Sequence, residues 1–82
     1  MEVKVKFICP EILGGMKNGT YNLPNDGTVI ALLEICESDC DFNVDREHLS
    51  WLLVLVNGKQ VGWDFQIPEK STVLFLRGAM GG

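Results

Sequence analysis

Only one stretch of this chain has the spacing of a long helix, and this restricts the folds that the chain can adopt. Val29, Leu32, Leu33 and Cys36 recur at i, i+3, i+4 and i+7, so they form one apolar stripe of an amphipathic helix. Thr28 stands directly before the stripe, where a side-chain oxygen can cap the helix. A lone helix must bury its stripe against a sheet, so the remaining segments are expected to supply that sheet.

The polar residues of the same stretch predict where the helix ends. Glu34, Glu37 and Ser38 fall off the apolar stripe, and we expect them to point into solvent. The polar stretch 38–43 is expected to end the helix, and residues 45–49 can add one further helical turn.

Strict alternation at the start of the chain predicts the first strand. One face of residues 2–9 carries Val3, Val5, Phe7 and Cys9, and the other carries Glu2, Lys4, Lys6 and Ile8. This period of two is typical of a strand with one buried face. Pro10 ends the strand, and turn-forming residues between positions 14 and 19 precede a short β-prone segment at 20–23. We expect that segment to close a hairpin on the first strand.

A second hairpin is predicted around Asn57-Gly58. A dense run of leucine and β-branched residues at 51–56 precedes this dipeptide, and both of its residues accept the positive φ angles of a type I′ turn. A short strand returns over residues 59–61, and a last strand is expected over 72–76. Residues 78–82 contain too much glycine for regular structure.

The predicted order is strand, strand, helix, strand, short strand, strand, which defines an α+β chain. We expect a mixed sheet of about five strands, covered on one face by one main helix, in the ββαββ order of a β-grasp fold. A chain of 82 residues is long enough for one small domain. We therefore assign residues 1–77 to a β-grasp domain and residues 78–82 to a flexible C-terminal tail.

The charge and composition of the chain exclude several classes of function. Seven basic and eleven acidic residues give a net charge of −4, and the pI is near 4.7. The basic residues form no stripe, so binding to nucleic acid or to an anionic membrane is disfavoured. The apolar run 51–56 is far too short to span a bilayer. Charged residues interrupt the N-terminal segment, so we expect no signal peptide.

The cysteines indicate a reducing compartment and no metal site. Cys9, Cys36 and Cys40 are three in number, so they cannot all pair within the chain, and we expect a cytoplasmic protein. Cys36 and Cys40 are accompanied only by His48, whereas a tetrahedral zinc site needs four ligands. We therefore expect Cys9 and Cys36 to be small buried apolar residues.

Three features of the sequence occur together over nearly the whole chain. Residues 26–29 (Asp-Gly-Thr-Val) open the predicted helix, residues 54–61 surround the Asn-Gly turn, and the chain stops at Gly81-Gly82 after its last strand. Together they resemble the ubiquitin-like sulfur-carrier proteins, the family of the small molybdopterin synthase subunit and of the thiamine sulfur carrier. The terminal Gly-Gly is the most specific of the three.

The resemblance implies that the reactive group is the C-terminal carboxylate of Gly82. In that family an E1-like enzyme uses ATP and magnesium to form an acyl-adenylate, which is then converted to a thiocarboxylate. Gly81 and Gly82 lack Cβ atoms and so fit a narrow channel, while Gly78 acts as a joint before Ala79 and Met80. The chain would bind no cofactor itself. It would be a sulfur donor and a substrate, and not an enzyme.

A carrier of this kind needs a docking surface, and the strand pattern predicts one. If Val73 and Phe75 face the helix, the alternate residues of the last and third strands face away from it. The residues predicted on this outer face are Ile8, Leu53, Leu55, Leu74 and Leu76. Because only one helix is available, we expect this apolar face to stay uncovered and to bind a partner.

Two points about this surface stay open at the level of sequence. Trp51, Trp63 or the 10–19 segment can instead fold over it. Arg77 can either pair with an acidic groove on the activating enzyme or point into solvent.

The family pattern is followed only in part, which bears on the pathway. Molybdopterin synthase small subunits usually carry Pro-Pro before Gly-Gly, whereas residues 75–80 here are Phe-Leu-Arg-Gly-Ala-Met, and Glu69-Lys70-Ser71 replaces an acidic turn that contains glycine. We expect molybdenum or tungsten pterin synthesis first, with a large synthase subunit as the sulfur acceptor. Carriers for thiamine, cysteine or tRNA thiolation and protein modifiers are alternatives, and so are a non-covalent β-grasp interaction module and a small enzyme or metal protein.

Overall fold

The computed structural model describes residues 1–78, and residues 79–82 lie outside that description. The strands are β1 (Glu2–Ile8), β2 (Gly19–Asn22), β3 (Leu52–Val56), β4 (Lys59–Val61) and β5 (Thr72–Arg77). The helices are α1 (Pro10–Leu13), α2 (Val29–Cys40) and the 3-10 helix η1 (Arg46–Trp51).

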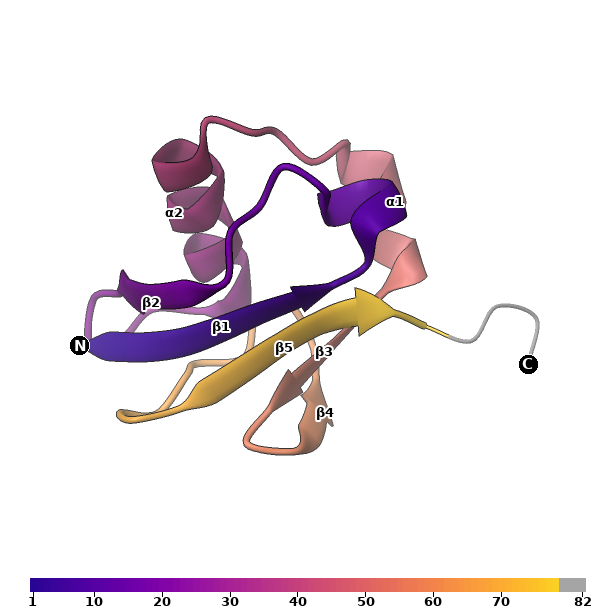
Figure 1. Cartoon of the computed structure of the whole chain (residues 1–82). Coiled ribbons are helices and arrows are strands. Elements are labelled where there is room, and N and C mark those ends of the chain that lie inside the picture. Colours follow the sequence, from indigo (N-terminus) through magenta and orange to yellow (C-terminus); the bar gives the residue numbers. More distant parts are fainter. Residues whose placement is uncertain (79–82) are drawn as a thin grey trace.

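The strands form one mixed, five-stranded sheet in the order β2-β1-β5-β3-β4. β1 pairs antiparallel with β2, and β3 pairs antiparallel with β4, so both predicted hairpins are present. The central strands β1 and β5 are parallel, and β5 pairs antiparallel with β3. Because β1 and β5 run in the same direction, β5 ends at the opposite end of the sheet from the N-terminus (Figure 1).

α2 packs its predicted apolar stripe against one face of this sheet. The buried residues of the stripe are Val29, Leu32, Leu33 and Cys36. The sheet contributes Val3, Val5, Val54, Val56, Val73 and Phe75 to the same core. Thr28 caps the helix as predicted, since its Oγ1 accepts a hydrogen bond from the N–H of Ala31 at 3.3 Å. The predicted α+β fold, with a mixed sheet covered by one main helix, is confirmed.

The segment between β1 and β2 differs from the prediction of a turn-rich stretch. Pro10 begins the short helix α1, at a position where proline removes no N–H that the helix needs. Ile12, Leu13 and Met16 are buried in the core, so burial of apolar side chains overrides the local turn signals. Figure 1 shows α1 on the same side of the sheet as α2.

The prediction that Glu37 points into solvent is wrong. Its side chain is 8% exposed, and its two carboxylate oxygens pair with the guanidinium of Arg46 at 2.8 and 3.0 Å. The same carboxylate accepts a hydrogen bond from the N–H of Val44 at 2.7 Å. Glu37 therefore fixes the segment between α2 and η1, through contacts that the helical period cannot indicate.

Glu37→Gln is expected to lower the free energy of unfolding by about 1–2 kcal/mol at neutral pH, because it removes the charge from the hydrogen bonds with Arg46 and Val44. The loss is no larger because the half-exposed Arg46 is screened by solvent. Burial raises the pKa of Glu37, but the hydrogen bonds from Arg46 and Val44 outweigh it and leave the pKa lowered. The ionised Glu37 carboxylate therefore stabilises the fold at pH values above the pKa that Glu37 has in the unfolded chain. This stabilisation is lost as the pH falls through the lower pKa that Glu37 has in the folded chain.

Urea denaturation at neutral and at acid pH checks this prediction, with Glu2→Gln as the matched control because Glu2 is exposed on β1. The difference between wild type and Glu37→Gln should shrink in acid, and Glu2→Gln should resemble wild type throughout. Equal stability of the two variants at neutral pH would contradict the assigned role of Glu37.

Positive φ angles occur in the turns on either side of the β4 region. Asn57 (φ 52°) and Gly58 (φ 86°) form the turn between β3 and β4, as predicted. Lys70 also has a positive φ of 59° just before β5, a conformation that costs a residue with a Cβ atom about 1–2 kcal/mol.

Lys70→Gly is expected to raise the free energy of unfolding by about 0.5–1 kcal/mol, because glycine removes the Cβ strain but loses more entropy on folding. Lys59→Gly is the matched control. Lys59 lies in the strand β4, where glycine should lower stability. Thermal melts of both variants test the pair, and a loss of stability in Lys70→Gly would refute the assignment of strain.

Candidate functional site at the end of the last strand

The chain leaves the sheet at Gly78, directly after β5. The N–H of Gly78 donates a hydrogen bond to the carbonyl of Trp51 at 2.9 Å, which extends the pairing of β5 with the β3 side of the sheet. A Cβ atom at Gly78 would lie 3.1 Å from Cγ of Leu53, so this close approach favours glycine. The predicted tail residues Ala79, Met80, Gly81 and Gly82 lie outside the described residues.

The structure brings five of the predicted docking residues together on the face of the sheet opposite α2. We call Ile8, Leu53, Leu55, Leu74 and Leu76 the outer patch. The Cα register places Leu76 between Ile8 and Leu53, and Leu74 lies next to Leu55. Ile8 is 55% exposed, and the leucines are partly exposed. The outer patch therefore adjoins the point where the chain leaves β5.

Neither Trp63 nor α1 lies over the outer patch in the described residues 1–78. Trp63 stacks against Phe75 with ring centroids 6.1 Å apart, and Phe75 belongs to the buried face of the sheet. Ile12 and Leu13 of α1 are also in the core. Figure 1 shows α1 and α2 on one side of the sheet, so the expected alternative, in which Trp63 or this segment folds over the patch, is not adopted.

The structure adds Trp51 to the site, a residue whose role the sequence left open. Trp51 is 40% exposed and stacks on His48 with ring centroids 4.8 Å apart. Its carbonyl is the group that holds Gly78. The apolar run 51–56 predicts that Trp51 begins a strand, but Trp51 is the last residue of η1 and the strand begins at Leu52. Nothing in the composition of the run distinguishes Trp51 from the strand residues that follow it.

Arg77 is separated from the other predicted docking residues. Side chains alternate along β5, so Arg77 has the same orientation as buried Phe75 and points away from the outer patch. The positive charge of Arg77 is one of the causes that lower the pKa of Glu11, at the start of α1. The pKa of Glu11 is lowered by its own backbone N–H, then by the Cys9 thiol, with a smaller effect from Arg77. Arg77 is exposed at the end of β5, on the face of the sheet opposite the outer patch.

The cysteines are buried or engaged in structural contacts. Cys9 and Cys36 are buried, as predicted, and burial is the main cause that raises the pKa of Cys36 to about 12. The Cys40 Sγ accepts a hydrogen bond from the N–H of Lys17 at 3.3 Å and lies 3.2 Å from the hydroxyl of Tyr21. A buried thiol whose pKa is raised, such as that of Cys36, is a poor nucleophile. Residues 1–78 place no group of three or more His, Cys, Asp or Glu side chains around a common metal position.

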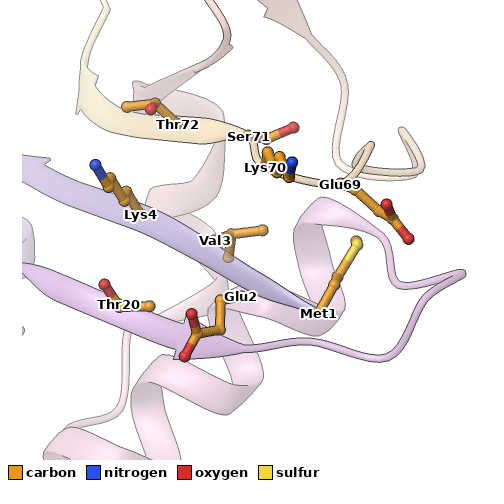
Figure 2. Close-up of a pocket in the computed structure, with 9 residues that line it drawn as sticks. All are labelled: Met1, Glu2, Val3, Lys4, Thr20, Glu69, Lys70, Ser71 and Thr72. Atoms are coloured by element: carbon orange, nitrogen blue, oxygen red, sulfur yellow. The ribbon is translucent and has the colours of Figure 1, made fainter.

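A shallow hollow lies at the opposite end of the sheet from Gly78. It is lined by residues 1–4, Thr20 and residues 69–72 (Figure 2). Its lining carries Lys4, Lys70 and the N-terminal ammonium of Met1 beside the carboxylates of Glu2 and Glu69. The hydroxyl of buried Ser71 is already bonded to the Pro68 carbonyl and the Asn57 amide. The hollow is remote from the tail, since β5 separates them by about 16 Å at the usual rise per residue.

Comparisons with known proteins bear on the fold. No family model and no curated protein matches the sequence of this chain. A solved structure, SAMP1 from Haloferax volcanii, is similar with a TM-score of 0.69, at 15% sequence identity, over 100% of both chains. No helix in residues 1–78 has the length and apolar character needed to cross a membrane. The similarity shows the fold alone: this chain adopts the ubiquitin-like β-grasp fold that the sequence predicted.

Proposed function

We propose that this chain is a sulfur carrier whose Gly82 carboxylate is adenylated by an E1-like enzyme and then converted to a thiocarboxylate. The observation that supports this most is the place where the chain leaves the sheet. Gly78 follows β5 beside the outer patch, and Gly81-Gly82 stand only a few residues further along the sequence. A partner that docks on the patch can therefore receive the tail in the same encounter.

The proposed reaction requires no side chain of the β-grasp domain. A carboxylate oxygen of Gly82 attacks the α-phosphorus of ATP, and the bond to pyrophosphate breaks, which gives an acyl-adenylate. Hydrosulfide supplied by a sulfur-donor enzyme then attacks the acyl carbon, the bond to AMP breaks, and Gly82 is left with a thiocarboxylate. Backbone atoms without Cβ at Gly81 and Gly82 leave room for this attack. The domain supplies recognition, and the chain acts as a substrate and sulfur donor.

The proposed partners and compartment follow from the same chemistry. The activating enzyme supplies ATP and magnesium, and a sulfur-acceptor enzyme, such as a large synthase subunit, takes the sulfur. We propose molybdenum or tungsten pterin synthesis as the pathway. The free cysteines Cys9, Cys36 and Cys40 are consistent with a reducing compartment, for which we propose the cytoplasm.

ATP–pyrophosphate exchange tests the proposal at its first step. The chain is incubated with an E1-like enzyme from the same cell, ATP, magnesium and labelled pyrophosphate. We expect exchange that depends on the chain and saturates with its concentration. An enzyme that catalyses exchange with its own carrier but not with this chain would contradict the proposal.

The exposed outer patch also supports a second candidate, a non-covalent interaction module in which Gly-Gly has no chemical role. This candidate requires that a chain truncated after Gly78 binds its partner as well as the full chain does. Leu55→Glu should abolish binding in both forms, because it places a charge within the outer patch, next to Leu74. Loss of binding on truncation alone would exclude the module.

A further inference from the structure

The outer face of the sheet changes in character along the strands, from apolar near the tail to cationic away from it. The row nearest to Gly78 is Ile8, Leu76 and Leu53, the next is Lys6, Leu74 and Leu55, and the third contains Lys4 and Thr72. The cations of this face therefore all come from β1. At the usual rise of a strand, Lys6 and Lys4 lie about 7 and 13 Å from Ile8 along β1, on the side away from Gly78.

This distribution is opposite to the charge of the whole molecule. The net charge is −4, and the acidic residues are concentrated in α2 and the segments that flank it: Asp26, Glu34, Glu37, Asp39, Asp41, Asp45 and Glu47. α2 lies on the other side of the sheet (Figure 1). Of the outward positions on the five strands, only Glu2, at the start of β1, is acidic.

We infer that this gradient orients the chain on its activating enzyme, whose complementary surface is apolar at the mouth of the tail channel and carries carboxylates opposite Lys6 and Lys4. The inference rests on the proposed function and adds the chemistry of the partner. Charge complementarity supports this orientation, because carboxylates on the enzyme attract Lys6 and Lys4 and repel the acidic residues on the α2 side of the sheet.

Orientation matters because the apolar part of the face is small, five side chains on three neighbouring strands. An apolar patch alone is non-directional, so it can bind in several rotations, most of which point Gly78 away from a channel. Carboxylates that pair with Lys6 and Lys4 select the rotation in which the apolar row lies at the channel mouth. Trp51, beside Gly78, is the aromatic residue that contacts the channel rim in this orientation.

The two lysines are not equivalent. Lys4 lines the hollow of Figure 2, where Glu2 and Glu69 also lie, and it is one residue pair further from the outer patch. Lys6 lies beside Leu74 in the register and next to the outer patch. Lys6 is therefore expected to contribute more than Lys4 to recognition.

Steady-state kinetics of ATP–pyrophosphate exchange test the inference, with the chain as the varied substrate. For Lys4→Glu/Lys6→Glu we expect KM to rise about 10-fold or more, with kcat within about 2-fold, because rim charges act on association. The matched control is Lys17→Glu/Lys59→Glu. It changes the net charge equally, at exposed positions away from the outer face, and should leave KM within about 2-fold of wild type. Added salt should raise the KM of wild type more than that of the Lys4/Lys6 variant.

Each outcome decides between distinct claims. Equal KM changes in both double variants would mean that only net charge matters and would overturn the oriented interface. Unchanged KM in the Lys4/Lys6 variant would overturn it as well, while exchange with wild type would leave the proposed function intact. No exchange with wild type would overturn both. Sedimentation that shows a dimer dissociated by Lys4→Glu/Lys6→Glu would assign this face to a second copy of the chain instead.

Discussion

Deletion of Gly82 is expected to abolish activation and to leave the folded domain unchanged. The deletion moves the terminal carboxylate back by about 3.5 Å along an extended chain. A displacement of only ~1 Å at a reacting centre can cost about 100-fold in rate, so we expect exchange to fall by at least that factor. The core lies within residues 1–78, so the melting temperature should not change.

The control for this deletion keeps the length of the tail and its Gly-Gly end. Met80→Ala alters one tail side chain, and we expect it to retain exchange within about 10-fold, since it leaves the carboxylate in place. A chain with one serine added after Gly82 should fail like the deletion. Normal exchange by either the shortened or the extended chain would refute a role for the Gly82 carboxylate.

Phe75→Ala is expected to have the largest effect on stability, a loss of about 3–5 kcal/mol in the free energy of unfolding. Phe75 is 0% exposed and lies on the central strand β5. Its ring stacks with Phe7 at 5.3 Å and with Trp63 at 6.1 Å. Small domains have only about 5–15 kcal/mol in total, so this variant should be largely destabilised at physiological temperature.

The matched control for that variant is Phe65→Ala. Phe65 is 38% exposed, so the same chemical change removes much less buried surface and should cost about 1 kcal/mol or less. Denaturant titration of both variants, followed by far-UV circular dichroism, makes the comparison. Similar losses in the two variants would contradict the position of Phe75 at the centre of the core.

The elements that the sequence predicted well are those whose pattern is local. The stripe from Val29 to Cys36, the alternation of residues 2–9 and the turn at Asn57-Gly58 each specify one backbone conformation within a few residues. They sufficed for the strand order along the chain and for the face on which each strand residue lies. The alternation along β3 and β5 likewise predicts that Leu55 and Leu74 lie on the outer face.

The residues that the sequence placed wrongly are those decided by distant contacts. Glu37 is polar and off the helical stripe, yet Arg46 and Val44 come back from the following segment to pair with it. For Arg77 the sequence leaves two roles open, pairing with an acidic groove on the activating enzyme or exposure to solvent. Alternation along β5 turns Arg77 away from the outer patch, and Trp51 joins the site only because η1 ends there.

The β-grasp fold does not identify the sulfur-acceptor pathway, which we propose from the sequence resemblance. Two features differ from the small molybdopterin synthase subunits that the sequence resembles: Lys70 stands where their turn has glycine, and no Pro-Pro precedes Gly81-Gly82. The fold itself is shared with SAMP1 at 15% identity. A fold alone does not specify a sulfur acceptor.

Intact-mass spectrometry tests the central claim most directly. The purified chain is incubated with ATP, magnesium, a sulfur source and an E1-like enzyme from the same cell, and the C-terminal peptide is then sequenced by fragmentation. The account predicts a mass gain equal to the replacement of one oxygen by sulfur, located at Gly82. An unchanged mass, with a folded chain and an enzyme that thiolates its own carrier in the same reaction, would contradict it.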